Sequence, residues 1–121
     1  MKRLTNKQIE TKAKIEIFSR IFGVDPKWAT AIAFTESSLG LNQKSPTHCR
    51  GVFQMSTIAM KDLLYEMEKI DDDLVDIVCG IAFLRLLKKR WSTIEDATAH
   101  YCAPNDRNFY IPKVLKLMEE V

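Results

Sequence analysis

Hydrophobic residues recur at spacings of three and four along most of this chain, and that period is typical of α-helices with one buried face. The clearest examples are the segments 8–22 and 74–91. The first follows Thr5 and Asn6, which are good helix caps, and it stops at Gly23. The second carries the most regular apolar stripe of the sequence, so we expect it to be the central helix of the fold.

Further segments complete a helical pattern. Asp25 and Pro26 are the residue types of a helix cap and a first helical position, and the helix that they begin runs past Glu36 to a stop at Gly40. A loop over 41–50 comes next, and more helices are expected over about 56–69, 93–103 and 110–120. No alternating strand pattern, internal repeat or linker is visible. The sequence therefore predicts one all-α domain over residues 1–121, with about six helices around a central helix.

Composition and charge exclude several classes of function. The 121 residues are 46% hydrophobic and 28% charged, which is an ordinary balance for a globular domain. The net charge of +2 is too small to indicate a nucleic-acid partner. No run approaches the roughly twenty apolar residues of a membrane-spanning helix, so we expect a soluble chain without stable membrane insertion. The basic run 88–90 and the acidic run 71–73 are expected at helix ends, where they complement the helix dipole.

The cysteines and histidines do not indicate a metal site. Cys49, Cys79 and Cys102 are an odd set without the short spacing of metal ligands, and we expect thiols; a disulfide between Cys49 and Cys102 is the open alternative. His48 and His100 each neighbour a cysteine, but adjacency in sequence does not make a catalytic Cys/His pair. No glycine loop that could cradle phosphate is present either. We therefore expect no cofactor.

Glu36 stands out because it lies among apolar residues near the end of a mostly apolar helix. Burial disfavours the charged form of a carboxyl and raises its pKa, which is how a glycosidase keeps a general acid protonated near neutral pH. A solvated glutamate at a helix end is the alternative that the pattern alone leaves open. Glu36 is thus a candidate catalytic acid.

Five segments, in order, resemble the motifs of lytic transglycosylases with the goose-type lysozyme fold. TESS at 35–38 and GVFQM at 51–55 resemble the Glu-Ser and Gly-hydrophobic-aromatic/Met-Gln motifs of that family. GIAFLR at 80–85 is similar to its central-helix segment, in which a Tyr/Phe-Leu pair follows a Gly. AHYCAP at 99–104 stands where the family has Ala-x-Tyr-Asn-x-Gly, and YIPKV at 110–114 resembles its closing Tyr-x-x-x-Val segment. The resemblance implies a lysozyme-like fold over nearly the whole chain.

The resemblance also implies an activity. Glu36 would protonate the glycosidic oxygen between N-acetylmuramic acid and N-acetylglucosamine in peptidoglycan and then act as base. The 6-hydroxyl of the muramoyl sugar would capture the glycosyl centre and give a 1,6-anhydro product without a second carboxylate, unlike most glycosidases. Ser37 would orient the following loop and contact substrate, and Gln54 would support that loop or bind sugar. Tyr101 would bind substrate and offer its hydroxyl to Glu36.

The same comparison extends to the groove walls and shows where this chain departs from the family. Met55, as a substrate-binding residue, would join Val52 and Phe53 in walling the groove. Cys102 replaces the Asn of the family motif and Pro104 replaces its Gly. Both departures fall in one segment, and they put the substrate contacts there in doubt.

Two alternatives stay open for the function. One is a true hydrolase, a lysozyme in which water attacks and a second acid such as Asp62, Asp71 or Asp106 positions it. The other is a catalytically impaired module that binds glycan or serves as a structural part of a virion.

The N-terminus has no apolar stretch of the length that a signal peptide requires, whereas peptidoglycan lies outside the cytoplasmic membrane. Action in the periplasm or cell wall then needs another route of delivery. We favour a phage endolysin or a virion component, with secretion-system wall enzymes as a second option. Virion or secretion-system proteins would then be partners, besides the glycan strands.

Overall fold

The computed structural model of the chain describes residues 3–43, 49–56 and 72–121. This part of the chain is mostly helical, which confirms the all-α class. The helix expected over 56–69 falls almost wholly outside the described residues. The elements are α1 (Asn6–Phe22), α2 (Pro26–Ser37), β1 (Cys49–Arg50), β2 (Met55–Ser56), α4 (Asp72–Arg90), α5 (Ile94–Tyr101), the 3-10 helix η1 (Pro104–Asp106) and α6 (Arg107–Glu120).

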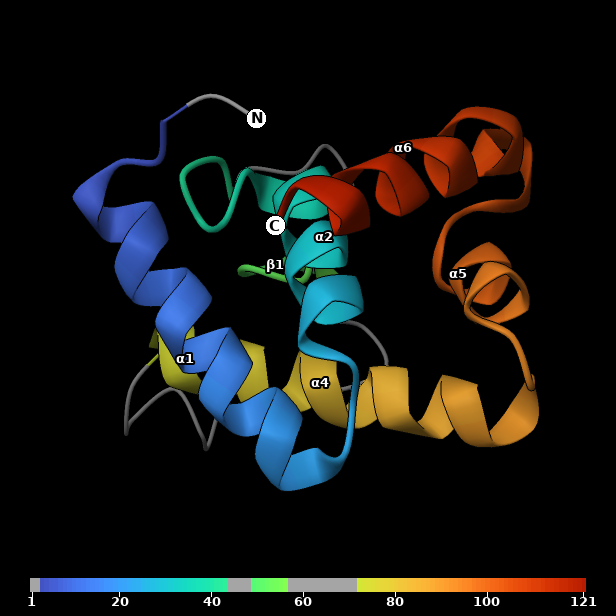
Figure 1. Ribbon diagram of the computed structural model, residues 1–121, viewed down its shortest axis with the longest axis horizontal. Helices are drawn as coiled ribbons and strands as arrows, with labels where there is room; N and C mark the ends of the chain where they lie inside the picture. Colours follow the sequence, from blue (N-terminus) through green and yellow to red (C-terminus); the bar gives the residue numbers. More distant parts are fainter. Residues whose placement is uncertain (1–2, 44–48, 57–71) are drawn as a thin grey trace.

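The most deeply buried of the described helices is α2. Figure 1 shows α2 in the middle of the view, with α1 and α5 to its two sides and α4 and α6 below and above it. Every residue from Trp28 to Ala33 is at most 1% exposed. The expectation that 74–91 forms the central helix is therefore wrong, because α4 keeps one face in solvent through residues such as Arg85 and Lys89. Alanines at 29, 31 and 33 let neighbouring helices approach α2 from several sides.

The caps predicted for the first two helices, Thr5 and Asp25, are confirmed. The Thr5 side chain accepts a hydrogen bond from the Gln8 backbone N–H at 3.2 Å, while the Thr5 N–H donates to the Gln8 side chain at 2.9 Å. These two bonds satisfy orphan donors at the start of α1, and Gly23 ends that helix in the left-handed region at φ 69°. At the start of α2, the Asp25 carboxylate accepts from the Lys27 N–H at 2.9 Å.

The end of α2 differs from the prediction. The helix was expected to continue to Gly40, but it ends at Ser37, and the next three residues all have positive φ. Ser38, Leu39 and Gly40 have φ of 51°, 55° and 88°. Side chains other than Gly are uncommon in this region, so the turn is strained, and Leu39 is held there because its side chain is completely buried. The turn reverses the chain directly after Glu36.

Two other boundaries shift by a few residues. Helix α5 ends at Tyr101 rather than 103, and α6 begins at Arg107 rather than 110. The connection between them is η1, in which Pro104 takes the first position, where its missing N–H costs nothing. Pro112 lies inside α6, one turn after its start. The basic run 88–90 forms the last turn of α4, as predicted.

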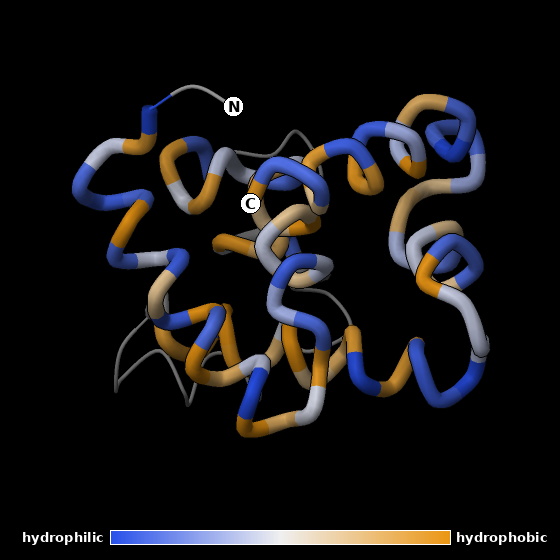
Figure 2. The backbone as a smooth tube through the Cα atoms, viewed as in Figure 1, coloured by the Kyte–Doolittle hydropathy of each residue, from blue (hydrophilic) through white to orange (hydrophobic). Residues whose placement is uncertain are grey.

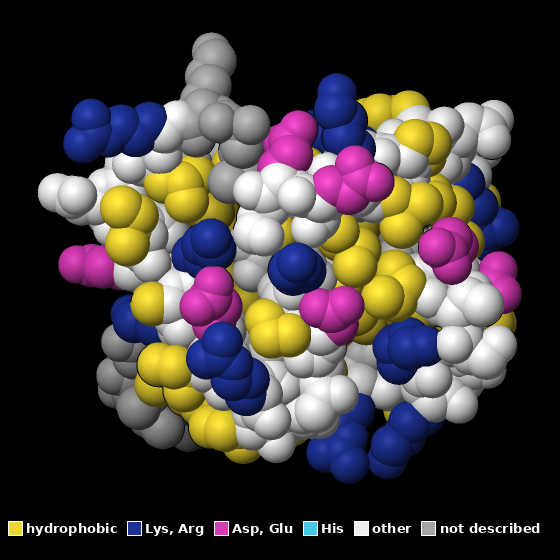
Figure 3. Space-filling model, in the orientation of Figure 1, with side chains coloured by type: hydrophobic (Ala, Val, Ile, Leu, Met, Phe, Trp, Pro, Cys, Tyr) yellow, Lys and Arg dark blue, Asp and Glu magenta, His cyan; other side chains and the backbone are white. Residues whose placement is uncertain are grey.

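Polar and charged residues are spread over the helices and over the surface, as the balanced composition predicts. Figure 2 shows polar residues interspersed along α1, α4 and α6. In the described ranges, no helix combines the length and the apolar character needed to cross a membrane. Figure 3 shows both signs of charge scattered over the visible face, with apolar side chains between them. That face carries no extended field of one sign.

Candidate active site

Glu36 lies in the last turn of α2 and is half-buried. The Tyr110 hydroxyl, on the facing side of α6, donates a hydrogen bond to Glu36 Oε1 at 2.6 Å. Tyr110 is itself only 6% exposed, so packing between α2 and α6 fixes the position of its hydroxyl. The carboxyl group is therefore held in one orientation by a neutral donor.

Burial raises the pKa of Glu36 above its ordinary value of 4.5. The hydrogen bond from Tyr110 acts in the opposite direction, because it stabilises the carboxylate, and the negative charge of Asp106 raises the pKa again. Burial is the largest of the three influences, so the net shift is upward. A carboxyl in this setting holds its proton to higher pH than a solvated glutamate, as a general acid requires.

Ser37 is a buried positioning residue. Its Oγ donates to the Val52 carbonyl at 2.6 Å and accepts from the Gly40 N–H at 3.0 Å, and it also lies 3.2 Å from the Ala33 carbonyl. The side chain thus joins the end of α2 to the loop at 51–54, as expected. With 2% of its surface exposed, Ser37 has no room to contact a sugar in this conformation.

The loop at 51–54 packs closely on α4. Gly51 has φ 81°, and a Cβ added there would come within 2.7 Å of Asp76 Cβ and closer still to the Asp76 carboxylate. A Cβ added at Gly80 would come within 2.6 Å of Phe53 Cβ and closer still to the ring. Phe53 is completely buried, and so is Val52. We had expected these two side chains to wall a groove, and that expectation is wrong. They anchor the loop in the core instead.

Gln54 supports the same loop through its amide. Its Nε2 donates to the Gly51 carbonyl at 2.8 Å and to the Gln43 carbonyl at 3.1 Å. The backbone of Gln54 has φ 52°, a strained value for a residue with a side chain. Of the two roles expected for Gln54, the structure shows the support of the loop. Met55 begins β2 and pairs with Arg50 of β1, and its side chain lies outside what the structure describes.

Tyr101 contacts the loop at 51–54 through its hydroxyl, which donates to the backbone carbonyl of Phe53. We had expected this hydroxyl to be offered to Glu36; Tyr110 makes that contact. The Tyr101 ring packs on Phe83 of α4, with centroids 5.6 Å apart. Burial first, and then the charge of Glu36, raise the pKa of Tyr101 well above its ordinary value of 10.0. Tyr101 therefore stays a neutral donor that borders the carboxyl.

Sequence reasoning missed the role of Tyr110. Its signal was present in the closing Tyr-x-x-x-Val segment, because Val114, one turn after Tyr110, is completely buried and shows which face of α6 packs inward. Burial, followed by the charge of Glu36, raises the pKa of Tyr110 far above its ordinary value, so its proton is available for the hydrogen bond at every working pH.

The segment that departs from the family motif lies beside Glu36. Cys102 is the cap residue after α5, where its N–H donates to the Thr98 carbonyl at 3.2 Å. Burial raises the pKa of the Cys102 thiol, the nearby Arg107 opposes this shift, and Glu36 is among the charges that act on it. All three cysteines lie in the described residues, and each is a thiol rather than half of a disulfide. The Cys49–Cys102 bridge is therefore not formed.

The five segments singled out in the sequence meet at one place. Ser37 of the first bonds to the loop of the second, and Phe53 of the second packs on Gly80 of the third. Tyr101 of the fourth bonds to that same loop, and Tyr110 of the fifth bonds to Glu36. Residues spread over most of the chain thus position one half-buried carboxyl group.

No family model, no curated protein and no solved structure matches this chain. In the described part of the chain, no group of three or more His, Cys, Asp and Glu side chains is placed to hold a metal ion. Of the acidic residues considered as a second catalytic group, Asp106 lies close enough for its charge to act on Glu36. Asp62 and Asp71 fall outside the described residues.

Replacing Tyr110 with Phe is expected to raise the pKa of Glu36 further, because the hydrogen bond that stabilises its carboxylate is lost while burial persists. In a reaction that uses Glu36 as its acid, the alkaline limb of the pH–rate profile should move to higher pH, and the rate at the optimum should fall because the carboxyl is less well oriented. Phe109→Ala, at an exposed site on the same helix, is the control. An alkaline limb that moves to lower pH in Tyr110→Phe contradicts the expectation.

Proposed function

We propose that this chain is a peptidoglycan lytic transglycosylase with Glu36 as its general acid and base, on a lysozyme-like helical fold. The observation that carries the proposal is the Glu36 carboxyl, whose pKa is raised by burial and whose orientation is set by the Tyr110 hydroxyl. The resemblance of the five segments supplies the substrate, the β-1,4 bond between N-acetylmuramic acid and N-acetylglucosamine. Their convergence around Glu36 supports it.

In the proposed reaction, Glu36 donates its proton to the glycosidic oxygen as the bond to the muramoyl C1 breaks. The resulting carboxylate then accepts the proton of the muramoyl 6-hydroxyl, whose oxygen forms the new bond to C1. Water is not consumed, and the product carries a 1,6-anhydro ring. A raised pKa favours the first step and makes the carboxylate a stronger base in the second.

A hydrolytic lysozyme is the second candidate, and Asp106 is the observation that favours it. Its side chain is exposed at the start of α6, and its charge acts on Glu36. In a hydrolase this carboxylate would orient water toward the muramoyl C1, as the second carboxylate does in inverting glycosidases. Asp106→Asn separates the candidates, because it would remove hydrolysis but leave transglycosylation in place.

The chemical form of the released product distinguishes the lytic transglycosylase from the hydrolytic lysozyme. Purified wild-type protein is incubated with peptidoglycan sacculi, and the released muropeptides are analysed by mass spectrometry for the loss of one water that marks anhydromuramoyl ends. Anhydro ends that are absent with Glu36→Gln support the transglycosylase. Reducing ends that depend on both Glu36 and Asp106 assign a lysozyme instead.

Sacculi that are bound but not cleaved by wild type would overturn the enzymatic proposal and leave a glycan-binding module.

The site of action implied by the substrate is the bacterial cell wall, and we propose delivery with a phage, as an endolysin or as part of the virion. Virion proteins or a secretion system would be its protein partners, and no cofactor is required by the reaction as written.

A further inference from the structure

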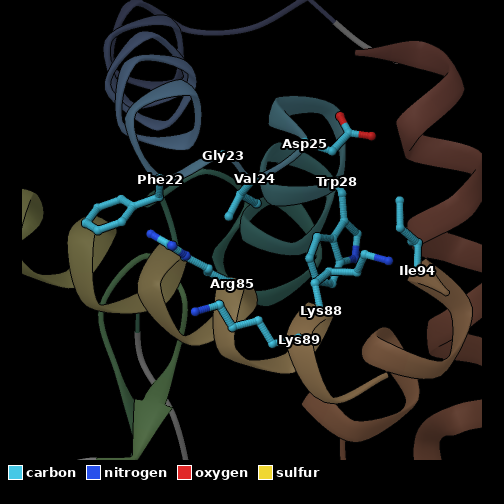
Figure 4. Close-up of a pocket in the computed structure, with 9 residues that line it drawn as sticks. All are labelled: Phe22, Gly23, Val24, Asp25, Trp28, Arg85, Lys88, Lys89 and Ile94. Carbon is cyan, nitrogen blue, oxygen red and sulfur yellow. The ribbon is translucent and has the colours of Figure 1, made fainter. Parts of the chain in front are cut away.

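A pocket lies at the opposite end of α2 from Glu36. It has a volume of about 360 Å³ and lies between the end of α1, the start of α2, the last two turns of α4 and the start of α5 (Figure 4). Glu36 lies eleven positions after Asp25 at the rim of this pocket, and at about 1.5 Å per helical residue the two sites lie roughly 16 Å apart. The pocket is therefore distinct from the candidate active site.

The floor of the pocket is apolar. Phe22 and Val24 line it from the turn between α1 and α2, and Trp28 and Ile94 line it from α2 and α5. Phe22 and Ile94 are partly exposed, so their side chains still offer apolar surface to a ligand. The Trp28 indole N–H donates to Thr98 Oγ1 at 2.9 Å, which fixes the ring as a rigid wall. A pocket of this size, near the lower end of the usual range of about 300 to 1,000 Å³, suits one large apolar side chain.

The rim on the α4 side is basic. Arg85 and Lys89 stand one helical turn apart, both are exposed, and Figure 4 shows their charged ends extending in the same direction, toward Phe22. Among the residues that the structure describes, no acidic side chain forms an ion pair with either. Two like charges at this spacing repel each other, so an anion beside them would relieve the repulsion. Lys88 lies next to them, with its Nζ donating to the Ser92 carbonyl at 2.6 Å.

The acidic residue of the rim does not neutralise these charges. The carboxylate of Asp25 caps α2 by accepting from the Lys27 N–H, and Figure 4 shows it turned away from Arg85 and Lys89. The basic rim is therefore available to a negatively charged partner.

We propose that this pocket binds an acidic peptide segment of a partner protein, with one large apolar side chain in the pocket and flanking carboxylates on Arg85 and Lys89. The apolar floor supplies burial, and the two basic groups fix the register of the segment. A nucleic acid or an anionic membrane would meet the same charges, and binding that does not depend on the apolar residue of the peptide would indicate one of these instead. The small net charge of the chain disfavours polyanions in general. This proposal does not depend on the activity of Glu36.

The test begins with a displayed library of random nine-residue peptides. Peptides that bind the wild-type chain are selected, and those that also bind the Arg85→Glu/Lys89→Glu variant are removed by counter-selection. The enriched sequences are expected to share one Leu, Ile, Met or Phe with at least two acidic neighbours. Fluorescence anisotropy of a labelled selected peptide should show about tenfold or more weaker binding to the double variant. Lys113→Glu/Lys116→Glu carries the same charge change on exposed positions of α6 and should alter the affinity by less than about threefold.

A peptide in which Ser replaces the apolar residue should also bind about tenfold or more weakly, because the pocket is then unfilled. Equal binding of that Ser peptide, or equal weakening by the two charge-reversed variants, would show general attraction of polyanions and overturn the proposal. So would the absence of any sequence enriched on wild type over Arg85→Glu/Lys89→Glu. All four substituted residues are exposed, but Lys89 lies in the last turn of α4, where a carboxylate opposes the helix dipole. We therefore expect a small drop in the melting temperature of Arg85→Glu/Lys89→Glu, and binding is compared at a temperature at which thermal melting shows every variant to be folded.

Discussion

A Glu36→Gln variant is expected to cleave sacculi roughly 10²- to 10⁴-fold more slowly than wild type, the range over which a general acid contributes to a rate. The amide cannot donate a proton to the glycosidic oxygen or accept one from the 6-hydroxyl. Its carbonyl oxygen can still accept the hydrogen bond from Tyr110, so the end of α2 should keep its position. Release of muropeptides, measured at matched protein concentration, gives the rate.

The same variant is expected to be more stable than wild type at neutral pH. Because folding raises the pKa of Glu36 above 4.5, the folded state binds more protons than the unfolded state between pH 4.5 and the raised value. Wild-type stability from this group is therefore fully present below pH 4.5 and is lost as the pH rises through the folded pKa. Gln carries no such charge, so the Tm advantage of Glu36→Gln should grow from pH 4 to pH 7.

The exposed Glu10 on α1 supplies the matched control. Glu10→Gln removes the same charge without removing a buried one, so it should leave both cleavage and the pH dependence of Tm close to those of wild type. A Glu36→Gln protein that cleaves sacculi at the wild-type rate would remove Glu36 from the catalytic role. A Tm difference that does not vary with pH would contradict the burial of its charge.

The starts of α1 and α2 could be predicted from sequence because their causes are local. The Thr5 and Gln8 side chains each accept from an orphan N–H group three residues away, and the Asp25 carboxylate accepts from the Lys27 N–H, so neither start depends on the rest of the fold. The end of α2 could not be predicted in this way. Ser38 and Leu39 have no local preference for positive φ; tertiary contacts hold them there, including the hydrogen bond at 3.0 Å from the Gln8 side chain to the Ser38 carbonyl.

How deeply each helix is buried also depends on tertiary packing. A regular stripe in the sequence made 74–91 look central, but a stripe indicates one buried face and leaves the opposite face in solvent. Burial on all sides needs small residues and few charges, and those belong to α2. This distinction matters for the site, because the enclosed helix is the one that carries Glu36.

The sequence could indicate which residues belong to the site. It could not indicate which of them contact one another. Tyr101 is the last residue of α5 and Tyr110 lies in the first turn of α6, so from the sequence either hydroxyl could have reached Glu36. The choice depends on the angle at which α5 and α6 approach α2, which no local pattern encodes. The same holds for Val52 and Phe53, whose apolar side chains suit a groove wall and a core equally well until Gly80 is seen beneath the Phe53 ring.

Gly80→Ala is expected to destabilise the protein by about 2 kcal/mol, although the same change normally stabilises an exposed helix interior by up to about 1 kcal/mol. The new methyl group would overlap Phe53, which is completely buried and cannot move aside without shifting the loop at 51–54. Because Ser37 and Tyr101 bond to that loop, its displacement should lower cleavage as well as stability. Urea unfolding and muropeptide release measure the two effects.

Gly23→Ala separates overlap from backbone strain. Gly23 has φ 69° and no atom within 4 Å of an added Cβ, so its substitution should cost only the strain of the left-handed region, about 1 kcal/mol, with cleavage unchanged. In the Phe53→Leu background, Gly80→Ala should cost less than in wild type, because the smaller side chain relieves the overlap. Equal cost in both backgrounds, or a stabilised Gly80→Ala chain, would mean that the loop does not rest on Gly80. The arrangement that joins the second and third segments around Glu36 would then be wrong.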